Sequence, residues 1–440
     1  MPALRQDLED LVRIESVSAD PARTAEVWRC ADAVADLFRA EGFESVDIVS
    51  ANGGGPAVLG HKPGPEGAPT VLLYAHHDVQ PENDHADWDS PPFEPTERDS
   101  PGGRRLYARG AADDKAGIAA HLGALRVFGD DLPVTVKVII EGEEEVGSDT
   151  LPVLLAEHKD KLEADVIVIA DSGNWDIGEP ALTTSLRGLV RMYVEVRTLD
   201  HGVHSGMWGG VVPDALMTLA RLLSTLHDDA GNVAVEGLVG GPAADVEYPE
   251  DRARGESGIA EGVGWIGDGP MVERLWTKPS LSVTGIDAPA AQGASNTLVP
   301  SARAMISLRI APGDTTANAT ERLTAHLEQH APWGARVTCT LSDKGEPIAI
   351  DATGPAYDAA RAAFTEAWDG TEPVDMGVGG SIPFIAEFLD TFPEASVLVT
   401  GVEDPDTRAH GANEGLHLAE FERVVVAEAL LLRNLGDLRR

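Results

Sequence analysis

The sequence predicts an α/β domain that is interrupted by a smaller α+β domain. Near both ends of the chain, short apolar runs alternate with stretches of helical periodicity, as expected for a mostly parallel sheet with both faces covered by helices. In the middle of the chain, strands alternate apolar and polar residues, as strands with one wet face do. We therefore predict an α/β domain over residues 1–185 and 346–440 and an inserted domain over residues 186–345.

The α/β domain opens with two helices. Leucines and a valine repeat at helical spacing from Leu4 to Val12, and a second helix fits residues 22–41. Buried strands are predicted at PAVLG from residue 56, TVLLYA from 70, VTVKVII from 134 and DVIVIAD from 165. Further helices are predicted from Lys115 and Thr150, and after the inserted domain at 356–368 and 418–435, with a strand at 395–401.

The inserted domain has the element order of a ferredoxin-like fold. The run LVRMYVEV (189–196) predicts a strand with one wet face, and residues 213–226 predict a helix. Residues 230–270 are rich in glycine and are interpreted as a loop. Strands at 281–286, 302–310 and 335–341, with a helix near 315–330, complete the order strand, helix, strand, strand, helix, strand.

The composition argues against nucleic acid and membrane partners. Acidic residues outnumber basic ones by 73 to 34, and the net charge of −39 repels phosphate backbones and anionic lipids. The acidic residues are scattered, which favours solubility, although some carboxylates could hold cations. The N-terminus does not resemble a signal peptide, and no run approaches the roughly 18 apolar residues of a membrane span. Cys30 and Cys339 lack metal-type spacing and indicate reduced thiols, so we predict a cytoplasmic protein.

The run VLLYAHHDVQP (71–81) ends a buried strand on three polar residues. Burial of His76, His77 and Asp78 without partners would be costly, so solvent or a bound ligand is expected there. His76 and Asp78 lie two residues apart and share a face of the extended chain. This spacing suits a metal-binding imidazole that is oriented by a carboxylate, whereas His77 points to the other side.

Other acidic residues and a histidine also follow strands or precede helices. Asp113 and Asp114 come just before a helix, where an aspartate is also a good N-cap. Residues Glu143–Glu145 follow a strand; a solvated loop would accommodate them, and so would a cation that neutralises them. Asp171 ends another strand, and His410 follows the last one.

One site can collect these side chains, because ligands of open α/β sheets bind at the carboxyl ends of the strands. The candidate donors are His76, Asp113, Glu145, Asp171 and His410. Two imidazoles and three carboxylates suit a pair of divalent ions that share a bridging carboxylate. Three carboxylates and a bridging hydroxide would balance the charge of two such ions. These donors tolerate zinc, manganese or cobalt, so the metal identity stays open.

The motifs HHDVQP, RGAADDK, EGEEEVGS, ADSGNW and AHGANE occur in the order seen in the M20 metallopeptidases. The sequence resembles the dipeptidase branch of that family, the carnosinase-type cytosolic dipeptidases, over nearly its whole length. The resemblance implies a zinc-peptidase-like catalytic domain with an inserted lid domain that is often used for dimerisation. One departure is that Ala116 stands between Lys115 and Gly117, where the family often has glycine directly after the lysine.

The resemblance implies a role for each candidate metal ligand. His76, Asp113 and Asp171 would hold one ion. Asp113, Glu145 and His410 would hold the other, so Asp113 would be the bridging carboxylate.

The resemblance also implies the groups that act on the reacting atoms. Asp78 would support His76, and Glu144 would be the general base that takes a proton from the metal-activated water and hands it to the leaving amine. The segment DHGVHSGMWGG resembles the family's stretch in which a lid histidine reaches across the dimer to the oxyanion. The matching position is His204, and His201 is the neighbour that could be confused with it.

Three further matches concern the substrate: Thr297 in SNTLVP, Arg309 in SLRIAP and Ser381 in GGSIP. Arg309 could form a bidentate pair with the free carboxylate of a short peptide. The turn Gly379-Gly380-Ser381 would offer backbone N–H groups to the same carboxylate.

The implied function is hydrolysis of dipeptides or short peptides with a free C-terminus by a homodimer that is joined through its lid domain. An N-acyl-amino-acid or succinyl-amine deacylase of the same superfamily is the alternative, because the metal motifs do not separate the two reactions. A non-catalytic binding protein would be expected to lack the base or a ligand, and all six positions are filled.

Overall fold

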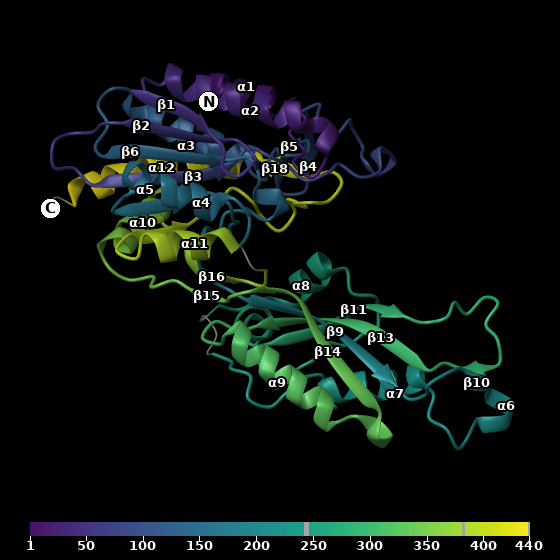
Figure 1. Cartoon of the computed structure of the whole chain (residues 1–440). Helices are drawn as coiled ribbons and strands as arrows, with labels where there is room; N and C mark the ends of the chain where they lie inside the picture. Colours follow the sequence, from purple (N-terminus) through teal and green to yellow (C-terminus); the bar gives the residue numbers. More distant parts are fainter. Residues whose placement is uncertain (242–245, 381–382, 439–440) are drawn as a thin grey trace. The chain divides into compact units, whose positions relative to one another are not determined.

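The computed structural model describes residues 1–241, 246–380 and 383–438, and the chain divides into two compact units (Figure 1). The first unit comprises Met1–Thr184, Ile350–Met376 and Pro383–Arg440, and the second comprises Ser185–Ala349 and Gly377–Ile382. The short segment from Gly377 therefore groups with the second unit, whereas the sequence assigns it to the α/β domain. A hydrogen bond from Arg187 Nε to the carbonyl of Gly379 (3.3 Å) is one of its contacts there.

The first unit is built around a mixed sheet with the strand order β1-β2-β6-β3-β7-β17-β8. The four central strands, β6, β3, β7 and β17, are mutually parallel, and the strands outside them pair antiparallel. The strands are β1 (Ser45–Val49), β2 (Ala57–Lys62), β3 (Thr70–His76), β6 (Thr135–Glu141), β7 (Val166–Ile169), β8 (Ala181–Leu186) and β17 (Ser396–Val399). The carboxyl ends of the four parallel strands therefore lie along one edge of the sheet.

Both faces of strand β3 are buried. Val71 and Leu73 pack into the main hydrophobic core, and Tyr74 on the opposite face stacks on Phe384 with ring centroids 4.4 Å apart. The core beneath Val71 is formed with α1 (Pro2–Val12), α2 (Thr24–Ala40), α3 (Lys115–Phe128), α10 (Pro355–Ala367) and α12 (Leu418–Asp437). The face of Tyr74 is covered by α11 (Pro383–Thr391), which packs on α4 (Leu151–Glu157). Burial on both sides explains why the run VLLYA is apolar without alternation.

A small sheet that the sequence does not predict lies in the same unit. It has the order β18-β5-β4, with β4 (Thr96–Ser100), β5 (Gly103–Tyr107) and β18 (Gly415–His417). The strands TERDS and GRRLY are largely polar, so hydrophobic alternation gives no signal for them.

The second unit has the predicted ferredoxin-like order. Its sheet runs β11-β13-β9-β14, and every pairing is antiparallel. The elements are β9 (Gly188–Arg197), α7 (Ala215–Leu223), β11 (Ser280–Asp287), β13 (Ser301–Ile310), α9 (Thr316–Gln329) and β14 (Arg336–Gly345). Alternate residues of β9, such as Val190 and Val194, pack with Leu219 of α7 and Leu323 of α9 in a separate core.

The prediction that residues 230–270 form only a loop is wrong, because α8 (Glu250–Ser257) lies within them. Ala253 is the one buried residue of this helix, so the sequence shows no apolar periodicity. Ion pairs at i, i+4 spacing, Arg252–Glu256 and Arg254–Glu250, accompany the helix instead. Across the part of the chain that the structure describes, no helix combines the length and the apolar character needed to cross a membrane.

Candidate metal centre

The candidate donors lie along the edge of the sheet where the four parallel strands end. His76 is the last residue of β3, and Asp171 follows β7 by two residues. Glu145 follows β6, and His410 lies in the loop after β17. Adjacent strands thus bring together residues that are far apart in the sequence, as expected at the carboxyl edge of an open α/β sheet.

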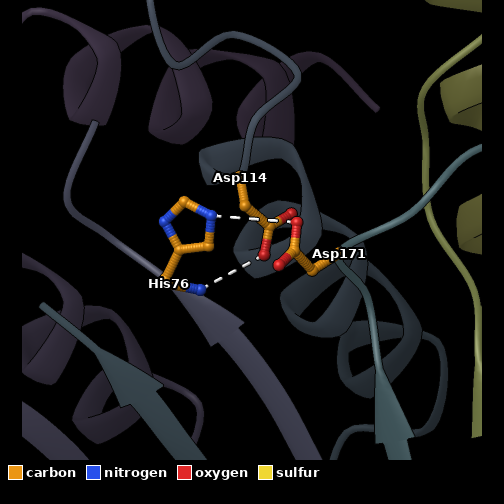
Figure 2. A group of neighbouring side chains, drawn as sticks. All are labelled: His76, Asp114 and Asp171. Carbon is orange, nitrogen blue, oxygen red and sulfur yellow. Dashed lines mark hydrogen bonds and ion pairs between the residues drawn. The ribbon is translucent and has the colours of Figure 1, made fainter. Parts of the chain in front are cut away.

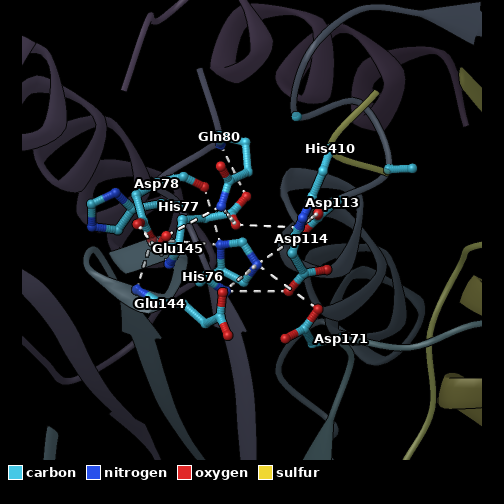
Figure 3. Close-up of polar contacts among 12 residues, drawn as sticks. His76, His77, Asp78, Gln80, Asp113, Asp114, Glu144, Glu145, Asp171 and His410 are labelled. Carbon is cyan, nitrogen blue, oxygen red and sulfur yellow. Dashed lines mark hydrogen bonds and ion pairs between the residues drawn. The ribbon is translucent and has the colours of Figure 1, made fainter. Parts of the chain in front are cut away.

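His76 is fully buried at the centre of the site (Figure 3). Its Nε2 lies 3.1 Å from Asp113 Oδ1, 3.8 Å from Asp171 Oδ1 and 4.0 Å from Glu144 Oε2. One ring nitrogen therefore faces three carboxylates that come from three different segments of the chain.

Asp78 connects His76 to the turn that carries the glutamates. The Nδ1 of His76 lies 3.0 Å from the carbonyl oxygen of Asp78 and 3.5 Å from its Oδ1. The Asp78 carboxylate also accepts the backbone N–H groups of Glu144 (3.2 Å) and Glu145 (3.1 Å). A partner of this kind fixes the orientation of an imidazole and leaves its other nitrogen free to face the site.

His410 completes the group from the solvent side. Its Nε2 lies 3.1 Å from Asp113 Oδ2 and 3.3 Å from Glu145 Oε2, and its side chain is 60% exposed. Asp113 therefore contacts His76 through one carboxylate oxygen and His410 through the other. The structure brings all five candidate donors, including Asp171, into one place in the first unit.

Among the residues that the structure describes, two groups of donor atoms are close enough to hold a metal ion. One is His76 with Asp113 and Glu145. The other, drawn in Figure 2, is His76 with Asp114 and Asp171. The second group contains Asp114, which the sequence does not single out as a ligand. Asp114 stands at the N-cap position of α3 but makes no side-chain cap; its Oδ2 accepts the backbone N–H of His76 instead (3.2 Å). Asp114 thus fixes the end of β3.

Gly117 gives Asp114 the room it needs. A Cβ atom at position 117 would lie 2.3 Å from Asp114 Oδ1, so a larger residue would collide with the carboxylate. Ala116, which separates this glycine from Lys115, is fully buried in the main core. The helix begins at Lys115, and the inserted alanine leaves the close approach between Gly117 and Asp114 in place.

Glu143 belongs to the acidic triplet but has different partners from Glu144 and Glu145. Its Oε2 accepts the backbone N–H of Gly55 (2.7 Å), and its Oε1 accepts the backbone N–H of Thr150 (2.6 Å). Glu143 therefore joins two loops, whereas its two neighbours face the site.

Gln80 is a site residue that the sequence analysis does not identify. Its backbone N–H donates to Glu145 Oε1 (3.0 Å), and its Nε2 donates to Glu145 Oε2 (2.7 Å). Gln80 lies within the motif HHDVQP, and this position is the only signal in the sequence that points to it.

Burial and mutual repulsion disfavour the charged form of three carboxylates. Burial and the nearby Asp171 raise the pKa of Glu144 to about 9, and burial and Asp113 raise the pKa of Glu145 to about 9. Burial also raises the pKa of Asp171 to about 6, although His76 opposes the shift.

Hydrogen bonds between the histidines and Asp113 shift their pKa values in opposite directions. Burial raises the pKa of Asp113, but hydrogen bonds from His410 and His76 outweigh it and lower the pKa below its ordinary value. Burial lowers the pKa of His76, but hydrogen bonds to Asp113 and Asp78 raise it well above its ordinary value. Protons therefore offset part of the negative charge of the cluster.

This donor set fits divalent cations. Proton uptake and cation binding are the two ways in which a buried carboxylate cluster can offset its charge, and a metal ion displaces protons when it binds. Imidazole nitrogen and carboxylate oxygen are suitable ligands for zinc and manganese.

The predicted lid and substrate residues lie in the second unit, apart from Ser381, which is outside the described residues. His204 in β10 (Val203–His204) is the direct cross-strand partner of Thr297 in β12 (Thr297–Leu298). The exposed His204 ring accepts the backbone N–H of Gly206 through Nδ1 (3.0 Å). Arg309 lies on β13 opposite Leu189 of β9, and burial and the nearby Arg191 lower its pKa.

The fold and the donor cluster define the class of a metal-dependent hydrolase with an inserted ferredoxin-like domain. The model of the family "Peptidase family M20/M25/M40" matches residues 72–434, and the chain belongs to this family. It is an enzyme of the hydrolase class.

Relatives of known function and structure are similar over most of their length. The chain is 35% identical over 392 residues to the cysteinylglycine-S-conjugate dipeptidase of Corynebacterium striatum, which covers 86% of this chain and 84% of the relative. It is 30% identical over 444 residues to the Beta-Ala-His dipeptidase of Homo sapiens, which covers 94% of this chain and 86% of the relative. The crystal structure of human carnosine dipeptidase 1 matches with a TM-score of 0.78 and 28% identity, covering 99% of this chain and 96% of that chain.

Proposed function

We propose that the protein is a two-metal dipeptidase that cleaves the amide bond of dipeptides or short peptides with a free C-terminus. The observation that carries this proposal is the convergence of two imidazoles and three carboxylates at one sheet edge, with Glu144 beside them. The relatives named above, which are dipeptidases, support the same substrate class.

In this proposal Asp113 bridges the two ions. His76, Asp113 and Asp171 would hold one ion, and Asp113, Glu145 and His410 would hold the other. The two oxygens of Asp113 already face different histidines, which supports a bridging role. The donors suit zinc, manganese or cobalt.

The side chains around the ions would carry the proton transfers. When bound, a metal pair supplies an activated water and positive charge against the developing oxyanion. Glu144 accepts a proton from the attacking water and delivers it to the nitrogen of the leaving amine. Asp78 fixes this base, because its carboxylate binds the Glu144 backbone N–H.

The second unit would bind the rest of the substrate. Arg309 would pair with the free C-terminal carboxylate, and the backbone N–H groups of Gly379 and Gly380 would donate to it. His204, with Thr297 beside it, donates a hydrogen bond to the oxyanion of the partner subunit's substrate.

A homodimer would form through the second unit. Strand β11 is an edge strand of its sheet, and it exposes Val283 (41%) and Ile286 (52%). Exposed apolar residues on a free sheet edge favour pairing with another chain. We place the dimer in the cytoplasm, which the two free thiols, Cys30 and Cys339, support.

A substrate panel tests the proposed activity. Metal-loaded protein should hydrolyse Cys-Gly and β-Ala-His. It should hydrolyse the same dipeptides with an amidated C-terminus much more slowly, because the amide removes the carboxylate that Arg309 would bind. N-acetyl and N-succinyl amino acids serve as the comparison. If only the acylated amino acids are hydrolysed, the protein is a deacylase and the proposed dipeptidase activity is wrong.

A further inference from the structure

Glu414 and Arg109 form a buried ion pair next to the candidate metal centre. Both side chains are almost completely buried, and Arg109 Nη1 lies 2.6 Å from Glu414 Oε2. A buried ion pair is costly to desolvate and is retained only when further hydrogen bonds satisfy its atoms. The question is which groups those hydrogen bonds hold.

The Glu414 carboxylate holds the backbone of the segment that carries Asp113. Its Oε2 accepts the N–H of Gly110 (3.0 Å), and its Oε1 accepts the N–H groups of Ala112 (2.9 Å) and Asp113 (3.2 Å). Hydrogen bonds from backbone N–H groups to a charged carboxylate are among the stronger ones in proteins. The backbone of Asp113 is therefore fixed directly by Glu414.

The same pair holds the turn that carries His410. Arg109 Nη2 donates to the carbonyl of Gly411 (3.1 Å), the residue after His410, and Glu414 lies three positions after Gly411. His410 has a φ of 61°, a left-handed conformation that residues with a side chain seldom adopt. Such a conformation persists only when the surrounding structure maintains it.

We propose that Glu414, held by Arg109, is the positioning residue that sets the carboxylate of Asp113 against the imidazole of His410. This inference rests on the proposed function, in which Asp113, Glu145 and His410 hold the second ion. Without Glu414, the segment of Asp113 and the turn of His410 would no longer be held together. The second ion would then lose more affinity than the ion held by His76.

A second buried pair in the same unit provides a matched control. Arg105 Nη2 lies 2.5 Å from Asp404 Oδ1, and both side chains are buried. Arg105 Nη1 also donates to the carbonyl of Gly415 (3.0 Å), and Asp404 Oδ1 also accepts the N–H of Asp406 (2.9 Å). Neither of these bonds involves Asp113 or His410. Glu414→Gln and Asp404→Asn therefore each disrupt one buried arginine–carboxylate pair, but of these two carboxylates it is Glu414 that accepts the backbone N–H of Asp113.

The test titrates Mn²⁺ into the full-length apoprotein and counts unbound ion by electron paramagnetic resonance, with thermal unfolding measured in parallel. Wild-type protein and Asp404→Asn should bind two ions with the same affinities. In Glu414→Gln both ions should bind more weakly, because both use Asp113. The second ion, which also uses His410, should lose more affinity, at least ~10-fold, as is typical when a residue that orients metal ligands is removed.

If Glu414→Gln does not fold, Glu414→Asp replaces it, because this variant keeps the charge but is too short to reach Arg109 and the backbone N–H groups together. Glu414→Asp should also lower the affinity for the second ion. Equal affinities in the Glu414 and Asp404 variants, whether both are weakened or neither is, would overturn the positioning role. Fewer than two ions bound by wild-type protein would instead contradict the proposed centre itself.

Discussion

Glu143 and Glu144 are adjacent in the sequence, but their side chains have different partners. Glu143 binds the backbone N–H groups of Gly55 and Thr150, whereas Glu144 Oε2 lies 4.0 Å from the His76 ring. Replacing each glutamate by glutamine changes one carboxyl group to an amide of the same size. The two variants therefore separate a catalytic carboxylate from a structural one.

Glu144→Gln should lower kcat by roughly 10²- to 10⁴-fold, because an amide cannot accept the proton of the attacking water. Metal binding should persist, since Glu144 is not among the proposed ligands. Glu143→Gln should keep kcat within a few-fold but destabilise the protein by about 1–3 kcal/mol, because two partly buried N–H groups lose their carboxylate acceptor. Steady-state kinetics and thermal unfolding of the two variants check these expectations. A near-normal kcat in Glu144→Gln would show that Glu144 is not the general base.

The sequence is informative about the candidate ligands, because each follows an apolar strand or precedes a helix, and those strands meet at one edge. It is less informative about the residues that hold the ligands. Gln80 binds Glu145, which is 65 positions away, and Glu414 binds the N–H of Ala112, which is 302 positions away. Apart from their places in the motifs HHDVQP and AHGANE, no hydrophobic periodicity marks either residue, because their partners lie in distant segments of the chain. Asp114 is a similar case, because its N-cap position conceals a contact with β3.

At the level of helices and strands, His121 links α3 to both β3 and α12. The fully buried imidazole lies 2.7 Å from Glu428 Oε1 through Nδ1 and 3.0 Å from the carbonyl oxygen of Tyr74 through Nε2. Both partners are acceptors, so the doubly protonated ring satisfies both. Burial lowers the pKa of His121, but the charge of Glu428 outweighs it, and the pKa is raised above 6.5.

This link makes a pH-dependent contribution to stability. A histidine whose pKa is raised in the folded state stabilises it fully below the unfolded value of 6.5, and the contribution is lost as pH rises through the folded pKa. The melting temperature of wild-type protein should therefore exceed that of His121→Gln most below pH 6.5, and the difference should shrink as the pH rises through the raised pKa of His121. Glu428→Gln should show the same narrowing relative to wild type; a difference that stays constant with pH would exclude an imidazolium at this position.

The elements that the sequence predicts are those with an apolar face. Strand β3 and helix α12 bury theirs in the main core, and the strands of the second unit show the alternation of a half-covered sheet. The elements that it does not predict, such as β5 and β18, are short and exist because each pairs with the other. Strand formation in such segments depends on a tertiary partner more than on local propensity.

For the whole molecule, the proposed dimer makes each active site depend on two chains. His204 would act on the substrate of the partner subunit, whereas Glu144 would act within its own. A His204→Ala subunit and a Glu144→Gln subunit are then each inactive alone but complementary together.

Co-expression of these two variants should restore activity to about a quarter of the wild-type value, because random pairing in a two-fold dimer makes half the dimers mixed and each mixed dimer has one complete site. His204→Ala co-expressed with the double variant His204→Ala/Glu144→Gln is the control and should stay inactive. If the two variants carry different affinity tags and are purified together as mixed dimers, but activity is not restored, His204 does not act across the interface.

The central claim is that two ions share Asp113, and a crystal structure of the Mn²⁺-loaded protein with anomalous diffraction data tests it most directly. The expected result is two anomalous peaks about 3.5–4 Å apart, one ligated by His76, Asp113 and Asp171 and the other by Asp113, Glu145 and His410. A single peak bound by His76, Asp114 and Asp171, with Asp113 and His410 free of metal, would contradict it.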